Sequence, residues 1–204
     1  RLDISPYDFS GAGWCHVYQH PDGTAMMTVT LRHRDRCFEE WDNPRVRGIR
    51  DHIFRSGDGG KTWGDRTLLT FHSAETSVLA LRNSQKMLAF VRSQRDFLAH
   101  DPPDLEEKTG AEKGRGWPVK NGVIGESHDG GRTWQNLRLF DTLGSVPGEI
   151  VQSPEGTVAV VWLQRYPHDK AEIRVRTTPD QGRTWSKTSY RLMLGTGYPS
   201  SVVY

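Results

Sequence analysis

Short strand-like runs of apolar and β-branched residues, separated by turn-forming residues, recur along the chain. Three of them, at 51–55, 122–126 and 172–176, each lead into a similar eight-residue segment, and a further strand-like run follows each segment. These following runs cover 66–71, 136–140 and 188–193. Runs of this length between turn residues predict β-strands.

Two more strands, joined by a tight turn, are expected upstream of each of these pairs. The turns are Pro21-Asp22-Gly23, Asn83-Ser84-Gln85 and Pro154-Glu155-Gly156. The expected first strands cover 14–19, 77–81 and 150–152, and the second strands cover 24–31, 86–91 and 157–163. Four strands per unit, repeated every roughly 50 to 70 residues, predict the blades of an antiparallel β-propeller.

We therefore expect an all-β fold of four-stranded antiparallel blades, in a single domain over residues 1–204. The blades should cover roughly 12–71, 75–140 and 148–193, and a further blade should start at 197–204. A propeller needs at least about four blades to close, and open sheet edges aggregate or recruit a partner. The chain is interpreted as part of a longer propeller, closed by the rest of the propeller or by a second chain.

The repeated segment has the form S/T-x-D-x-G-x-T-W and covers 56–63, 127–134 and 178–185. The carboxylate of its Asp can accept hydrogen bonds from its own turn, and its Gly supplies a positive φ. The Trp is suited to packing beneath the loop. We therefore predict structural, not catalytic, roles for the three carboxylates, which belong to Asp58, Asp129 and Asp180.

Composition excludes several classes of protein. A net charge of +2, from 27 Lys and Arg against 25 Asp and Glu, does not fit a nucleic-acid binder. The chain contains no stretch of 18 apolar residues, which is about the length needed to span a membrane. The 7 Trp, 7 Phe and 6 Tyr favour a folded core despite a mean hydropathy of -0.67. No metal-ligand spacing, P-loop or dinucleotide fingerprint occurs, so we expect no metal and no cofactor. Cys15 and Cys37 could form one disulfide or remain two buried thiols.

The repeated segments resemble the Asp boxes, or BNR repeats, of the sialidase (neuraminidase) superfamily, and the resemblance covers nearly all of the chain. It implies a β-propeller that is six-bladed when complete, with the boxes on the face away from the site. It also implies a secreted or periplasmic protein, which we expect to be bacterial. Asp boxes occur in non-catalytic propellers and in other carbohydrate-active enzymes too, so the fold does not settle the function.

Every connection from a second to a third strand begins with arginine: Arg32 or Arg34, then Arg92, then Arg165. Converging guanidinium groups suit a carboxylate, which Arg holds bidentately. Sialidases are similar in holding a sugar carboxylate with three arginines, so Arg34, Arg92 and Arg165 are candidate substrate-binding residues. Alternatively, each arginine is solvated or pairs with the Asp that follows it within four residues.

Residues 149–165 look like the sialidase blade that contributes a Glu and a binding Arg. By this resemblance Glu149 activates a tyrosine nucleophile, which sialidases use in place of a carboxylate. A Glu that opens its strand and an Arg that closes the hairpin partner should lie side by side. Glu149 could also be a plain polar strand start, and Glu75 occupies a similar place in the second unit.

Other residues of the family pattern are matched less well. Asp51, or as second choice Asp42, sits where the family has its acid/base, ahead of the third strand of the first blade. The family's first arginine motif is absent, since Gly13-Trp14-Cys15 stands where it might fall. Tyr198 and Tyr166 are both within reach of the expected site face, and Tyr198 is a candidate substrate-binding residue. Neither tyrosine lies in a nucleophile motif.

The expected function is that of a sialidase-like glycoside hydrolase that removes a terminal acidic sugar, sialic acid, from glycans. One alternative is a propeller lyase or hydrolase for uronic-acid polysaccharides, for which the candidate bases are His33, His72, His100 and His168. The other is a non-catalytic glycan-binding propeller. In each case the partner is a glycan or an acidic sugar.

Overall fold

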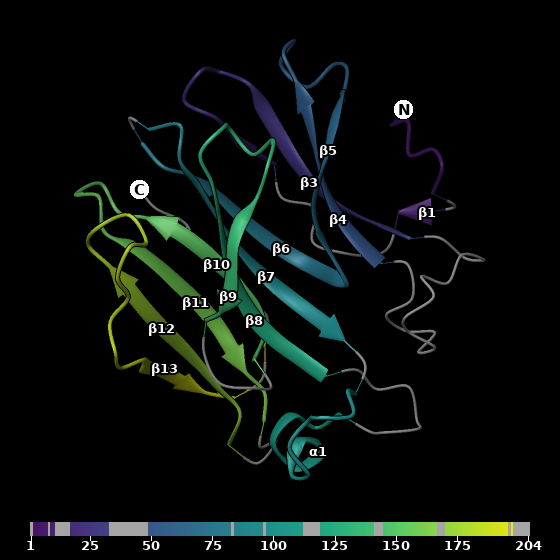
Figure 1. Ribbon diagram of the computed structural model, residues 1–204. Helices are drawn as coiled ribbons and strands as arrows, with labels where there is room; N and C mark the ends of the chain where they lie inside the picture. Colours follow the sequence, from purple (N-terminus) through teal and green to yellow (C-terminus); the bar gives the residue numbers. More distant parts are fainter. Residues whose placement is uncertain are drawn as a thin grey trace.

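A computed structural model describes residues 2–7, 9–10, 17–32, 49–82, 84–95, 97–111, 119–140, 145–166, 170–195 and 197. These residues form three antiparallel sheets and, within the described part, one short helix, α1 (Leu105–Thr109) (Figure 1). The expected all-β fold is confirmed.

The three sheets follow one another along the chain. In the first sheet, β3 (Ala25–Arg32), β4 (Ile49–Ser56) and β5 (Gly64–Phe71) are neighbours in that order, and β1 (Phe9–Ser10) and β2 (Val17–Gln19) pair with opposite ends of β3. The second sheet has the order β6 (Ser73–Ala80), β7 (Met87–Arg95), β8 (Val119–Ser127), β9 (Gln135–Leu139). The third has the order β10 (Ser145–Gln152), β11 (Val158–Gln164), β12 (Glu172–Thr178), β13 (Tyr190–Leu194).

Two first strands begin earlier than the sequence predicts. β6 begins at Ser73 instead of Ser77, and β10 begins at Ser145 instead of Ile150. Each contains a register shift near its start, between Ala74 and Ser77 in β6 and between Val146 and Gly148 in β10. An irregularity of this kind breaks the alternation of side chains by which a strand is recognised in a sequence.

The sheets pack face to face in chain order, because β10 contacts β6 and β7 while β6 contacts β3 and β4 (Figure 1). The core between the second and third sheets contains Phe90, Val160 and Trp162, each at most 1% exposed. Phe140 packs edge-on against Phe90 and Trp162, with ring centroids 5.4 and 5.5 Å apart. Burial of this apolar surface is the main force that holds the sheets together.

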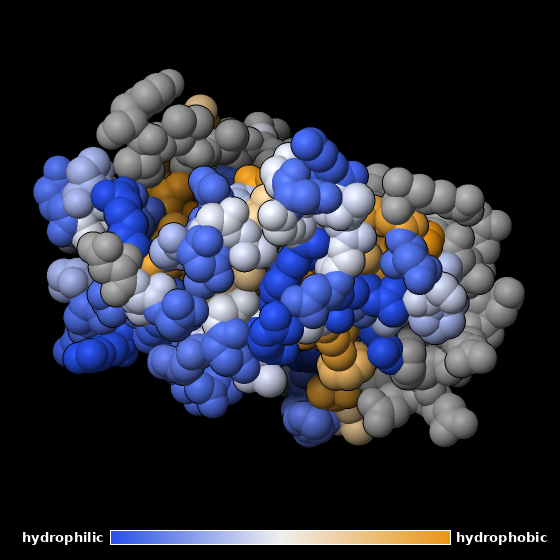
Figure 2. Space-filling view, turned by 90° about the horizontal axis from the view of Figure 1, so that it is seen from above, coloured by the Kyte–Doolittle hydropathy of each residue, from blue (hydrophilic) through white to orange (hydrophobic). Residues whose placement is uncertain are grey.

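Each sheet has two distinct ends. The pairing of Ala25 with Ser56 puts the first Asp box beside the turn between β2 and β3, and the pairing of Arg32 with Ile49 marks the other end. We call the first the box end and the second the connection end. The box ends lie toward the top of Figure 1 and α1 lies at the bottom. Figure 2, seen from above, shows that the box-end surface is mostly hydrophilic.

Candidate functional site

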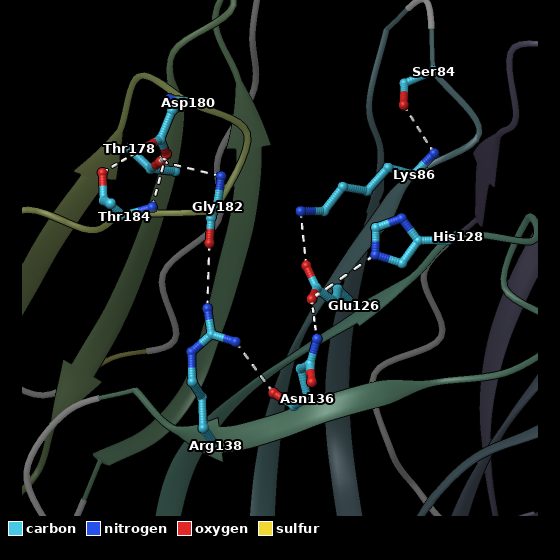
Figure 3. Close-up of polar contacts among 10 residues, drawn as sticks. All are labelled: Ser84, Lys86, Glu126, His128, Asn136, Arg138, Thr178, Asp180, Gly182 and Thr184. Carbon is cyan, nitrogen blue, oxygen red and sulfur yellow. Dashed lines mark hydrogen bonds and ion pairs between the residues drawn. The ribbon is translucent and has the colours of Figure 1, made fainter.

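Each Asp box is closed by its own side chains. Asp58 accepts hydrogen bonds from Ser56 Oγ (2.7 Å), from Thr62 N (2.9 Å) and from Thr62 Oγ1 (2.6 Å). The same three contacts recur around Asp129 and Asp180, the latter drawn in Figure 3. The hydrogen bonds from Thr62 lower the pKa of Asp58 to about 2. The structural role of these carboxylates stays a prediction, and this local network gives its physical basis.

The boxes also join neighbouring sheets. The Arg55 guanidinium on β4 donates to the Gly130 carbonyl of the second box (3.2 Å). In the same way Arg138 on β9 donates to the Gly182 carbonyl of the third box (3.2 Å; Figure 3). An arginine of one sheet therefore supports the box of the next sheet.

Five charged side chains gather at the connection end, and we call them the charged cluster. They are Asp51 on β4, Glu75 on β6, Arg92 on β7, Lys120 on β8 and Arg165 directly after β11. Glu75 forms an ion pair with Arg92. The charges of Arg92, Lys120, Arg165 and Asp51 all act on Glu75. All three sheets contribute to the cluster.

Asp51 lies inside β4, within the strand-like run at 51–55, and not in the connection ahead of it where the family resemblance places an acid/base. Its side chain is only 1% exposed and accepts hydrogen bonds from Thr30 Oγ1 (2.6 Å) and from Thr76 Oγ1. Burial raises the pKa of Asp51, against the effect of these hydroxyls, Ser73 and the charge of Arg92. Because Thr30 is on β3 and Thr76 on β6, the carboxyl links the first sheet to the second.

Glu75 is a central residue of the cluster, although no role for it follows from the sequence. It lies within the irregular part of β6 with a φ of 61°, a left-handed conformation that is costly for a residue with a Cβ. Its side chain is 11% exposed, and burial raises its pKa against the charges of Arg92, Lys120 and Arg165. Strained backbone and a perturbed carboxyl pKa are typical of functional sites.

Glu149 is buried between the first strands of the second and third sheets. It is 7% exposed and accepts a hydrogen bond from Ser77 Oγ (2.9 Å), which in turn accepts one from Ile150 N (3.2 Å). It pairs with Val161, four residues before Arg165, so the expectation that Glu149 and Arg165 lie side by side was wrong. The pairing continues without a break from Gln152 and Val158 beside the turn, so the turn itself places Glu149 opposite Val161. Nor is Glu149 equivalent to Glu75, because it follows the irregularity of its strand and Glu75 lies within one.

The predicted arginines are brought together in part. Arg92 lies within β7, which continues to Arg95, so the expectation that Arg92 begins the connection was wrong. It is 11% exposed beside Glu75, and no ion pair joins the half-buried Arg165 to another described residue. Arg32, the alternative to Arg34, ends β3 opposite Ile49, also at the connection end. Several candidates lie outside the described residues: Arg34, Asp42, Tyr198, Cys15, Cys37, His33 and His168.

The charged cluster has an excess of positive charge. Three cations face two carboxyl groups, and burial raises the pKa of both carboxyls. Such an arrangement attracts anions, and guanidinium groups are suited to carboxylates. Among the residues that the structure describes, no group of three His, Cys, Asp or Glu could hold a metal, and no helix is long and apolar enough to cross a membrane.

No protein-family model matches the sequence, and no curated protein sequence matches it either. Solved structures do. A Hadza microbial sialidase, Hz136, is 16% identical with a TM-score of 0.58, over 84% of this chain and 36% of that one. The K499G mutant of NanB sialidase from Streptococcus pneumoniae is 10% identical with a TM-score of 0.58, over 93% and 47%. A protein of unknown function from Dyadobacter fermentans is 18% identical with a TM-score of 0.62, over 87% and 54%.

At these identities the similarity shows the fold. The three sheets are blades of the β-propeller found in sialidases, which confirms the propeller expected from the sequence. The chain spans between 36% and 54% of the length of these three structures.

Proposed function

We propose that the protein is a sialidase-like glycoside hydrolase that removes a terminal acidic sugar, of the sialic acid type, from glycans. The observation that carries this proposal is the charged cluster at the end of the blades opposite the Asp boxes, in which Arg92 pairs with Glu75 and the charges of Lys120 and Arg165 also act on it. A sugar carboxylate is the anion for which this arrangement is suited. The sialidase names of two similar structures support this choice of sugar.

In this proposal the cluster residues have separate roles. Arg165 and Lys120 bind the sugar carboxylate, while the ion pair with Glu75 holds the Arg92 guanidinium in place. Glu149 accepts a proton from the hydroxyl of the nucleophile, and Ser77 fixes its orientation. Asp51 supports the cluster from behind, since an acid/base must reach its substrate and this carboxyl is 1% exposed.

The wider setting is also a proposal. We propose a glycan as the partner, a secreted or periplasmic location in a bacterium, and closure of the ring by further blades or by a second chain. The greater length of the similar structures supports closure by further blades, and the NanB sialidase of Streptococcus pneumoniae supports a bacterial origin.

One observation favours a second candidate function, a non-catalytic glycan-binding propeller. Both candidate catalytic carboxyls are buried, Asp51 at 1% and Glu149 at 7% exposed, and both are held by hydroxyl donors. A propeller that only binds an acidic sugar needs the cations and not these carboxyls.

The test uses the full-length protein and a panel of sialosides and neutral glycosides. Arg165→Lys keeps the charge but loses the bidentate fork, so it should weaken binding of acidic sugars about tenfold and leave neutral sugars unaffected. Arg191→Lys, at an exposed site on β13, is the control and should change neither. Glu149→Gln should leave binding intact and slow turnover, because only proton transfer is lost.

Three results would contradict these assignments. Release of sialic acid by Glu149→Gln at the wild-type rate would exclude its catalytic role. Equal binding of acidic and neutral sugars by the wild type would exclude the role of Arg165. Tight binding of sialic acid with no turnover of any sialoside would favour the binding propeller.

A further inference from the structure

Residues 97–111, in the connection between β7 and β8, have an ordered structure of their own beside the charged cluster. Arg95, at the end of β7, forms two hydrogen bonds of 2.7 Å with the carboxylate of Asp101. Leu105 and Ala111 are buried together with Val119, the first residue of β8. Lys120 of the charged cluster follows Val119 directly. The connection is therefore joined to the cluster at the start of β8.

A contact with the third blade holds this connection from the other side. Gly110 ends α1 with a φ of 59°, in the left-handed region. The ring of Tyr166 lies directly on it, so that a Cβ added at Gly110 would overlap Cε1, Cζ and Cδ1 of the ring. Glycine is therefore required twice, for its backbone conformation and for the close approach of the ring.

Tyr166 is the residue after Arg165. Its ring is fixed on Gly110, and its carbonyl accepts a hydrogen bond from Gln164 Nε2 (3.3 Å). The backbone on both sides of Arg165 is thus held by contacts. A long side chain on a fixed backbone has less freedom to lose when it binds a ligand, and this improves affinity.

We propose that Gly110 and Tyr166 form a lock between two blades that positions Arg165 for the carboxylate of an acidic sugar and makes residues 105–111 a wall of the site. This inference rests on the proposed function, because it assigns Arg165 to the sugar. Gly110 and Tyr166 are positioning residues and act on the sugar only through Arg165.

The experiment compares Gly110→Ala, Tyr166→Ala and the double variant in the full-length protein, with Gly23→Ala as control. Gly23 also has a positive φ, of 91°, but a Cβ there meets nothing within 4 Å, so the control has the backbone strain without the displaced ring. Binding of free sialic acid and of a neutral sugar is measured by calorimetry. Amide hydrogen exchange is followed at residues 105–111.

Gly110→Ala and Tyr166→Ala should each weaken binding of sialic acid by up to about tenfold, the cost of ordering one long side chain. The double variant should bind no more weakly than Tyr166→Ala, because the methyl group occupies the space that the ring leaves. Wild-type affinity in Gly110→Ala, with a loss of stability no larger than in Gly23→Ala, would overturn the proposal.

Amide exchange separates this proposal from the proposed function because it needs no sugar. Faster exchange at residues 105–111 in Tyr166→Ala supports the lock even if the wild type binds no acidic sugar. Unchanged exchange overturns the lock even if sialic acid binds tightly.

Discussion

The two ends of the blades are built in opposite ways. At the box end, the hydrogen bonds of Asp58 come from residues two and four positions away. At the connection end, the partners of Asp51 are 21 and 25 residues away, and Ser77 and Glu149 are separated by 72 residues. One end is folded by a single short segment, whereas the other exists only when three sheets have assembled.

The pKa values of the carboxyl groups are shifted in opposite directions at the two ends. The carboxylates of Asp58 and Asp129 are exposed, and hydrogen bonds lower the pKa of Asp58. The carboxyls of Asp51 and Glu75 are buried, and burial raises their pKa. Ionisation of the Asp58 carboxylate therefore stabilises the fold, whereas burial opposes ionisation of Asp51 and Glu75. Buried carboxyl groups with raised pKa values are expected where a protein keeps a functional site.

The largest difference between the ends should appear when an ion pair is broken. Arg92→Met removes the cation from a pair whose two side chains are each 11% exposed, and leaves Glu75 without its nearest counter-ion. We expect a loss of about 3 kcal/mol in the free energy of unfolding, measured with urea. Arg132→Met is the matched control at the box end, where the pair with Asp65 is 57% and 49% exposed, and should have little effect. Equal losses in the two variants would contradict the contrast.

The second prediction concerns the pH dependence of stability, compared in Asp58→Asn and Asp51→Asn. The folded-state pKa of Asp58 is lowered to about 2, so its contribution is present above about pH 4 and lost as the pH falls toward 2. The folded-state pKa of Asp51 is raised, so the unfolded chain ionises first and the wild type loses stability as the pH rises above about 4.

The measurement is urea unfolding of the wild type and both variants between about pH 2 and pH 7. The stability difference between wild type and variant should grow with pH for Asp58→Asn and shift in the opposite direction for Asp51→Asn. Slopes of the same sign would show that the two ends do not differ in this way.

The same contrast explains what the sequence could predict. The box residues and the strands on either side of them are recognisable because their contacts are local and repeat three times. The ends of β3 and β11 lie within one residue of the predicted ends, so Arg165 could be assigned to the connection end in advance, whereas β7 runs on to Arg95 and contains Arg92. A repeated local pattern is sufficient for this part of the fold.

The site itself depends on details that local patterns do not contain. An irregularity in β6 aims Glu75 at Arg92. In β10 the pairing of Glu149 with Val161 continues unbroken from the turn, and this register separates Glu149 from Arg165. Asp51 faces hydroxyls of β3 and β6 that become its neighbours only in the assembled sheets. The one signal for Glu75 was a Glu near the start of two units, and the structure shows that the two positions are not equivalent.

The smallest expected effect tests how self-contained the boxes are. The position after the Asp is Gly59 in the first box and Gly130 in the second, with φ values of 72° and 67°, but it is Gln181 in the third, with a φ of 59°. A side chain in this conformation costs about 1 kcal/mol, part of which is offset because glycine makes the unfolded chain more flexible. Gln181→Gly should therefore raise the free energy of unfolding by about 0.5 kcal/mol. Gly59→Gln should lower it by a similar amount, since a Cβ at Gly59 meets nothing within 4 Å.

Sugar binding should stay unchanged in both variants, because the hydrogen bonds of the Asp box do not involve the residues of the charged cluster. A Gln181→Gly variant that unfolds more easily would show that this side chain supports the third box, and a change in sugar binding would show that the two ends are coupled.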